Sequence, residues 1–202
     1  MAYTPCTSSI ARNIQMDCSK PLSGGYTGLA LLIPSDSAYS VVQDSTNPRK
    51  VVSISPENDT VVVVDNLSVV SPFDGSSTAS SADSGTRSFT KTVAFRVPQR
   101  GADVSKEIIE GLCNSRGVIC VAEKKDNTAD GKYEVIGLLN PLKVTEDGVQ
   151  RTESENGGAT MITMSCEEVW YELDLVGQKD SGDEYTLAGA KAAFDAIMAQ
   201  AV

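Results

Sequence analysis

Short runs of β-branched and aliphatic residues, separated by polar turn residues, dominate the sequence. Residues 28–33, 50–54 and 60–64 are such runs, each bounded by Pro, Asn, Asp or Ser, which is typical of strands. Residues 88–97 alternate instead, and one face of that segment carries Phe89, Lys91, Val93, Phe95 and Val97. This alternation predicts a strand with one buried face.

The later part of the chain continues the strand pattern. Residues 117–122 and 132–139 flank a polar segment that ends in Asp130-Gly131, a dipeptide that favours a hairpin turn. Residues 169–175 alternate between apolar side chains and a mostly acidic face. We expect them to form a strand paired with residues 159–166, and the acidic face carries Glu168, Glu172 and Asp174.

Two segments have the spacing of amphipathic helices. In the first, Val104, Ile108 and Leu112 share one face, and Asp103 is placed to cap the turn. The second, residues 186–202, is rich in Ala and carries a stripe of Leu187, Ala190, Phe194, Ile197 and Ala201. The sequence therefore predicts a mainly β fold, a sandwich or barrel-like pair of packed antiparallel sheets, with one helix between strands and a C-terminal helix.

The segment from residue 65 to residue 90 lacks a clear periodic pattern. Its centre, residues 71–88, consists mainly of Ser, Thr, Gly, Asp and Ala. Loops of this length are uncommon in compact domains and are usually functional or disordered. We expect an arm or an extended hairpin that projects from a single β-rich domain of residues 1–180, which the helix in 181–202 then follows.

Composition argues against several function classes. The 202 residues include no His, and 17 Lys and Arg residues face 27 Asp and Glu residues, for a formal charge of −10. Ser-His and Cys-His nucleophiles and histidine metal sites therefore cannot form. The negative charge repels nucleic-acid phosphate. We expect no enzymatic activity, no catalytic residues, no cofactor and no metal.

Individual motifs do not change this picture. Residues 126–134 imitate the start of a calcium loop, but Gly137 stands where the closing Glu should be. Two Asp-Ser-Gly triplets, at 83–85 and 180–182, lie in polar sequence and suit turns better than an aspartic dyad. The N-terminal stretch has no charged start followed by an apolar core, so we expect a soluble protein that is made in the cytosol and not exported.

Charge is distributed unevenly along the chain. Residues 146–184 carry eleven acidic residues, opposed only by Arg151 and Lys179. In residues 87–106 the balance reverses, since Asp103 is the only acid among five basic residues. An ordinary solvated surface explains this pattern, and so does head-to-tail self-association through complementary patches.

These features together resemble the major tail (tail-tube) proteins of long-tailed bacteriophages. The likeness covers about residues 20–176 and consists of a β-rich domain with one helix between strands, a long Ser/Gly-rich loop and opposed charge patches. The sequences of residues 8–13 (SSIARN) and 89–105 (FTKTVAFRVPQRGADVS) also resemble those of structural proteins of phages that infect Bacteroides-like gut bacteria.

The resemblance implies a virion protein of the phage tail, made in the host bacterial cytoplasm. Its copies would form stacked, hexameric rings around a β-lined, acidic lumen that lets DNA pass without specific binding. Other tail or neck proteins would be further partners, and no membrane would be involved. The inter-ring loop would include Ser71, Pro72, Phe73, Asp74, Gly75, Ser84, Gly85 and Arg87, and the lumen would be lined by Glu168, Glu172 and Asp174.

Three other readings remain open at this point. The chain could be a neck, tail-terminator or capsid-decoration protein, which would form single rings instead of stacks. It could be a non-enzymatic carbohydrate-binding β-sandwich, although aromatic residues for a sugar platform are scarce, with one Trp, six Tyr and four Phe. An enzyme built on carboxylates is the third reading, without a constellation of residues to name.

Overall fold

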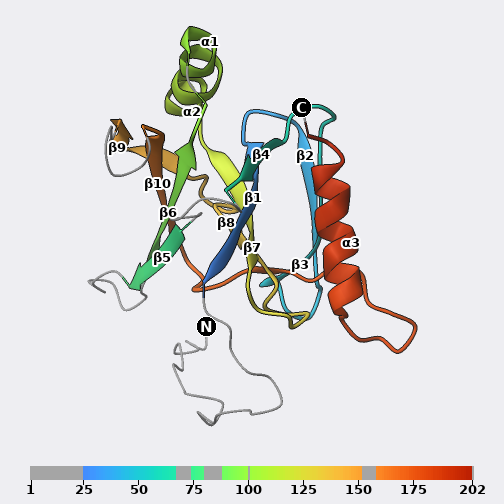
Figure 1. The fold of residues 1–202 in the computed structure, drawn as a ribbon. Coiled ribbons are helices and arrows are strands. Elements are labelled where there is room, and N and C mark those ends of the chain that lie inside the picture. Colours follow the sequence, from blue (N-terminus) through green and yellow to red (C-terminus); the bar gives the residue numbers. More distant parts are fainter. Residues whose placement is uncertain (1–24, 67–73, 80–87, 100, 152–157, 202) are drawn as a thin grey trace.

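The computed structural model describes residues 25–66, 74–79, 88–99, 101–151 and 158–201, and these form a mainly β fold with two sheets (Figure 1). The larger sheet has the order β2-β3-β11-β8-β7-β1-β4, built from β1 (Tyr26–Pro34), β2 (Tyr39–Gln43), β3 (Lys50–Pro56), β4 (Val62–Asp65), β7 (Val118–Lys124), β8 (Tyr133–Ile136) and β11 (Asp174–Leu175). The smaller sheet has the order β5-β6-β10-β9, built from β5 (Asp74–Ala79), β6 (Phe89–Val97), β9 (Lys143–Arg151) and β10 (Thr160–Glu168). This agrees with the predicted fold class.

The seven-stranded sheet is buried on both faces because it is the middle layer. Its inner face packs on the four-stranded sheet, and its outer face packs on the C-terminal helix α3 (Leu187–Met198). In β1, Ala30 and Leu32 belong to the first core, whereas Leu31 and Ile33 belong to the second. A strand that is buried on both faces reads as a continuous apolar run, and this explains residues 28–33 and 117–122.

The helix α3 is fixed to the sheet by its apolar stripe. The side chain of Thr186 caps its first turn by accepting a hydrogen bond from the Gly189 amide. Ala190, Phe194 and Ile197 are buried, and the Phe194 ring stacks on Tyr133 of β8 with centroids 4.4 Å apart. The predicted helix and most of its predicted stripe are therefore confirmed.

A second helical segment lies between β6 and β7, as predicted. It consists of α1 (Ala102–Val104), a π-helical turn (Ser105–Glu110) and α2 (Gly111–Asn114). Its apolar side chains cover one end of the first core. The expected cap at Asp103 is wrong, because the segment begins at Ala102 after Gly101 and has no side-chain cap.

The predicted pairing of residues 159–166 with 169–175 is wrong. β10 pairs with β6 and β9, whereas β11 lies in the other sheet, parallel to β3 and antiparallel to β8. Residues 169–173, which we call the crossover segment, therefore pass from one sheet to the other. The alternation in this stretch does not mark one buried face, since Val169 and Tyr171 are exposed whereas Leu173 is buried.

The expected arm between residues 65 and 90 contains a strand. β5 pairs with β6 in antiparallel register, from Asp74 opposite Ala94 to Ala79 opposite Phe89. β5 consists of Asp, Gly, Ser, Thr and Ala residues, so propensity alone gave no strand signal. Residues 67–73 and 80–87 lie outside the described residues.

The thiols of Cys120 and Cys166 are free and buried, whereas Cys113 is free and exposed. Burial raises the pKa of Cys166 to about 12. In the part of the chain that the structure describes, no helix has the length and apolarity needed to cross a membrane.

Candidate functional site

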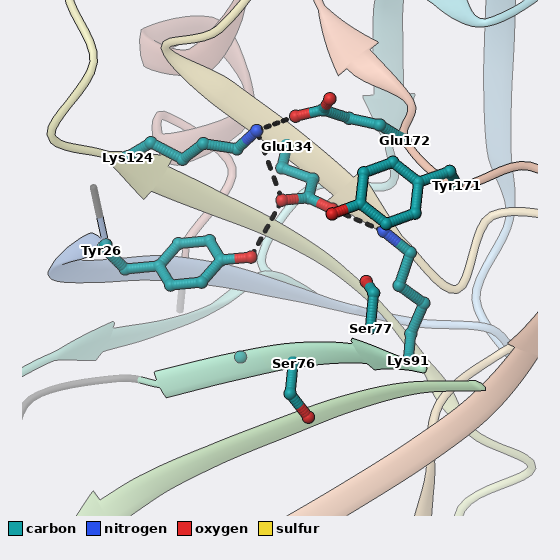
Figure 2. Close-up of a pocket in the computed structure, with 10 residues that line it drawn as sticks. Tyr26, Ser76, Ser77, Lys91, Lys124, Glu134, Tyr171 and Glu172 are labelled. Atoms are coloured by element: carbon teal, nitrogen blue, oxygen red, sulfur yellow. Dashed lines mark hydrogen bonds and ion pairs between the residues drawn. The ribbon is translucent and has the colours of Figure 1, made fainter. Parts of the chain in front are cut away.

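A polar cavity of about 290 Å³ lies between the two sheets, at the end where β1 begins (Figure 2). We call it the inter-sheet cavity. Strands of both sheets and the crossover segment contribute its walls, which consist of Gly25, Tyr26, Gly75, Ser76, Ser77, Lys91, Lys124, Glu134, Tyr171 and Glu172.

The centre of this site is a buried ion pair between the sheets. Lys91 lies on the inward face of β6 and is only 1% exposed. Its Nζ donates a hydrogen bond of 2.7 Å to Oε1 of Glu134 on β8. A buried charge is very costly unless it is paired, so each of these two groups requires the other.

Two further groups bind the second oxygen of Glu134. The Tyr26 hydroxyl donates to Oε2 at 2.8 Å, and Nζ of Lys124 lies 3.3 Å from the same atom. Burial alone would raise the pKa of Glu134, but the two lysines and the hydrogen bonds outweigh it and the pKa is lowered. Glu134 is therefore held as a carboxylate.

Lys124 lies among three carboxylates. Besides Glu134, it contacts Oε1 of Glu172, and Oδ1 of Asp174 is 4.0 Å away. Burial alone would lower the pKa of Lys124, yet the surrounding negative charges outweigh it and the pKa is raised. The Lys124 amine thus stays protonated.

Tyr171 of the crossover segment completes the wall above Lys91. Its ring centroid is 5.2 Å from Nζ of Lys91, within the range of a cation–π contact. The ring of Phe89 meets Tyr171 edge-on with centroids 5.5 Å apart. The Tyr171 ring therefore lies beside the ion pair, at the wall of the cavity (Figure 2).

The charged side chains of this cavity stabilise one another in their ionised forms. Glu134 and Lys124 are kept in their charged forms, and burial with the nearby Glu134 charge raises the pKa of Tyr26 far above neutrality. Among the residues that the structure describes, no group of three or more Asp, Glu or Cys side chains is placed to hold a metal ion.

The three acids expected to line a lumen do not share an exposed strand face, so that expectation is wrong. Glu168 is buried at the end of β10, where its Oε1 accepts hydrogen bonds from the amides of Gly137 and Leu138 at 2.9 and 3.1 Å. Glu172 binds Lys124 from the crossover segment. Asp174 belongs to β11, in the other sheet.

Most of the expected inter-ring loop falls outside the described residues, namely Ser71, Pro72, Phe73, Ser84, Gly85 and Arg87. Asp74 and Gly75 begin β5, and Gly75 lines the inter-sheet cavity. A Cβ atom at Gly75 would lie 2.9 Å from the Tyr26 ring, so a larger residue there would require the ring to move. The inter-ring role stays a prediction.

Lys91 and Glu134 were not predicted as site residues, although each left a trace in the sequence. Lys91 is the one charged residue on the apolar face of an alternating strand, and Glu134 interrupts the apolar run of residues 133–138. A charge on a buried face implies a buried partner. The sequence does not show which strands face each other, so it could not pair the two.

Comparison with known proteins gave no match. No family model matches the chain, no curated protein matches it in sequence, and no solved structure matches its fold.

Proposed function

We propose that the chain is a structural subunit that assembles with copies of itself through the edges of its two sheets. The end strands of the described sheets are β2 and β4 in one, and β5 and β9 in the other. Three of these four strands carry exposed valines: Val42 at 54%, Val62 at 37%, Val63 at 38% and Val149 at 40%. These valines are the observation that carries the proposal.

Apolar edge strands favour pairing with further strands. Proteins that stay monomeric usually protect their edges with Lys, Pro, bulges or a covering segment. In β4, Val62 and Val63 are adjacent and therefore point to opposite faces of the sheet. Edge pairing with a second copy would cover both side chains and satisfy the open backbone groups of the strand.

The specific role that we propose is the tail tube of a long-tailed bacteriophage. Edge-to-edge pairing around a closed, six-membered ring gives a continuous β wall, and stacking of rings gives a tube. The two-layer sheet architecture and the helical segment between β6 and β7 support this role. The net charge of −10 suits a conduit that DNA passes without adhering.

Sedimentation velocity with edge variants tests the proposal. The wild-type protein should form oligomers that grow with concentration, and the double variant Val62→Lys/Val63→Lys should remain a monomer. Leu139→Lys is the control, because Leu139 is also an exposed apolar residue, at 52%, but lies outside the edge strands. An unchanged oligomer in the edge variant would contradict assembly through β4.

The same measurement separates the tube from related virion roles. A tube subunit forms open-ended stacks, whereas a neck, tail-terminator or decoration protein stops at a ring or binds another protein. A discrete ring at every salt and protein concentration would support those roles against the tube. A monomer under all conditions would contradict self-assembly altogether.

A further inference from the structure

A carboxylate with one buried, unsatisfied oxygen lies at each end of the crossover segment. Glu168 precedes it and Asp174 follows it. Oε2 of Glu168 and Oδ1 of Asp174 are both buried without a hydrogen-bond partner. Such groups are costly in the ionised form. Ionisation of the flanking acids is therefore costly at both ends of the crossover segment.

The charges around Asp174 do not balance when every group is ionised. Three carboxylates, Glu134, Glu172 and Asp174, surround the inter-sheet cavity and its border, and two ammonium groups, Lys91 and Lys124, oppose them. One negative charge is therefore in excess, and a proton on Asp174 removes it.

Among the residues that the structure describes, no further cation pairs with Asp174. On β3, its register neighbour Lys50 is bound to Asp130 at 2.8 Å. On β8, its register neighbour is the carboxylate of Glu134. Lys124 on β7 is the nearest cation, 4.0 Å away, and it is shared with Glu134 and Glu172. The neighbouring charges of Glu172, Glu134 and Asp130 all oppose ionisation of Asp174.

The crossover segment carries the contacts that this charge would disturb. Trp170 packs against the second core, Tyr171 covers Lys91, and Glu172 binds Lys124. Glu172 and Asp174 are two residues apart and both face Lys124. When both carry a negative charge, they repel each other, and this repulsion opposes the position of the segment at the inter-sheet cavity.

We propose that the crossover segment is a pH-dependent latch over the inter-sheet cavity, closed when Asp174 is protonated and released when Asp174 ionises. This device does not depend on the proposed tail-tube role. Burial, followed by the charge of Glu172, raises the pKa of Asp174 to about 8. The latch would therefore respond to a small rise of pH above neutrality.

Trp170 is the only tryptophan of the chain, so intrinsic fluorescence of the full-length protein reports on the segment directly. Emission and acrylamide quenching are followed from about pH 6 to about pH 10. The wild-type protein should show a transition near the pKa of Asp174, at about pH 8, with Trp170 more accessible on the alkaline side. Asp174→Asn should lose the transition and keep Trp170 protected throughout.

Two further variants make the result specific. Glu172→Gln removes one neighbouring negative charge. The pKa of Asp174 should fall, because Lys124 then has one fewer competing carboxylate, so the transition should move to lower pH. Asp130→Asn is the matched control, because this carboxylate is more exposed and its main partner is Lys50; it should leave a clear transition. Circular dichroism at each end of the pH range confirms that the variants are folded.

The proposal is overturned by either of two results. One is a wild-type protein whose Trp170 emission and quenching are constant across the range. The other is an Asp174→Asn variant that keeps the wild-type transition at the same midpoint. If Asp174→Asn does not fold, the midpoint of Glu172→Gln decides, since an unshifted midpoint contradicts the latch.

Discussion

Nζ of Lys91 in the four-stranded sheet lies 2.7 Å from Oε1 of Glu134 in the seven-stranded sheet. Apolar side chains join the two sheets over most of their contact. At the end where β1 begins, this ion pair replaces them. The pair thus fixes the register of one sheet on the other where apolar packing ends.

Replacing Lys91 should therefore destabilise the protein strongly. Lys91→Met leaves the Glu134 carboxylate buried, with only Lys124 and Tyr26 as partners. Loss of one partner from a buried pair costs about 3 kcal/mol or more. Urea unfolding measures this loss of the free energy of unfolding.

The matched control is Arg116→Met. Arg116 also pairs with an acid, Asp36, but its side chain is 89% exposed, so the change should cost less than about 1 kcal/mol. Removing the charge of Glu134 as well, in Lys91→Met/Glu134→Gln, should restore much of the lost stability. Equal losses of the free energy of unfolding in Lys91→Met and Arg116→Met would show that the buried pair contributes no more to stability than the exposed pair.

Stability should also depend on the ionisation of Asp174. Its pKa rises from 3.8 to about 8 on folding, because of burial and the nearby Glu172 charge. The folded protein keeps this proton in a pH range where the unfolded chain releases it, so stability falls as pH rises from about 4 to about 8. Asp174→Asn should reduce that fall.

Unfolding by urea at a series of pH values measures this dependence. The difference between wild type and Asp174→Asn isolates one group, since Glu134, whose pKa is lowered, contributes an opposite slope in acid. Parallel stability curves for the two proteins would mean that Asp174 has the same pKa in the folded and unfolded states.

The packing of α3 gives a third prediction. Phe194 is buried and stacks on Tyr133, so Phe194→Ala should cost about 3–5 kcal/mol. Phe194→Leu keeps much of the volume and should cost less. Thermal unfolding followed by circular dichroism checks both. A helix signal that melts separately, with the sheets unaffected, would show that α3 is not part of one cooperative unit.

Gly177 gives a fourth prediction, because its backbone crosses the start of α3 closely. Its φ is +72°, and a Cβ atom there would lie 2.1 Å from the Gly189 carbonyl oxygen. Gly177→Ala should cost more than about 2 kcal/mol through strain and the displaced helix. Gly101→Ala is the control, since Gly101 also has a positive φ, at +131°, but faces open space. Equal losses of stability would mean that the close contact itself costs nothing.

The local pattern of the sequence predicted the structure correctly where all residues of the pattern belong to one strand. The run of residues 28–33 and the alternation of residues 88–97 both mark strands that the structure contains. The β5 strand was missed because its Gly and Ser residues form backbone pairs without an apolar face. Residues 169–175 were misread because alternation across a crossover imitates a strand.

The candidate site depended on information that no local pattern holds. Lys91 and Glu134 are 43 residues apart in the chain, and only the packing of one sheet on the other brings them together. Glu172 and Asp174 were expected to line a lumen, whereas in the structure both face Lys124. Their partner Lys124 could not be found, because the strand order that places β7 near β11 is not readable from spacing.

Electron microscopy of the purified protein over a range of concentrations and salt tests the central proposal most directly. Self-assembly through sheet edges predicts stacked rings that form tubes, with β4 of each copy at a contact and with Val62 and Val63 covered. The Val62→Lys/Val63→Lys variant should give no tubes, whereas Leu139→Lys should give normal ones. Monomeric particles from the wild-type protein under every condition would contradict the account.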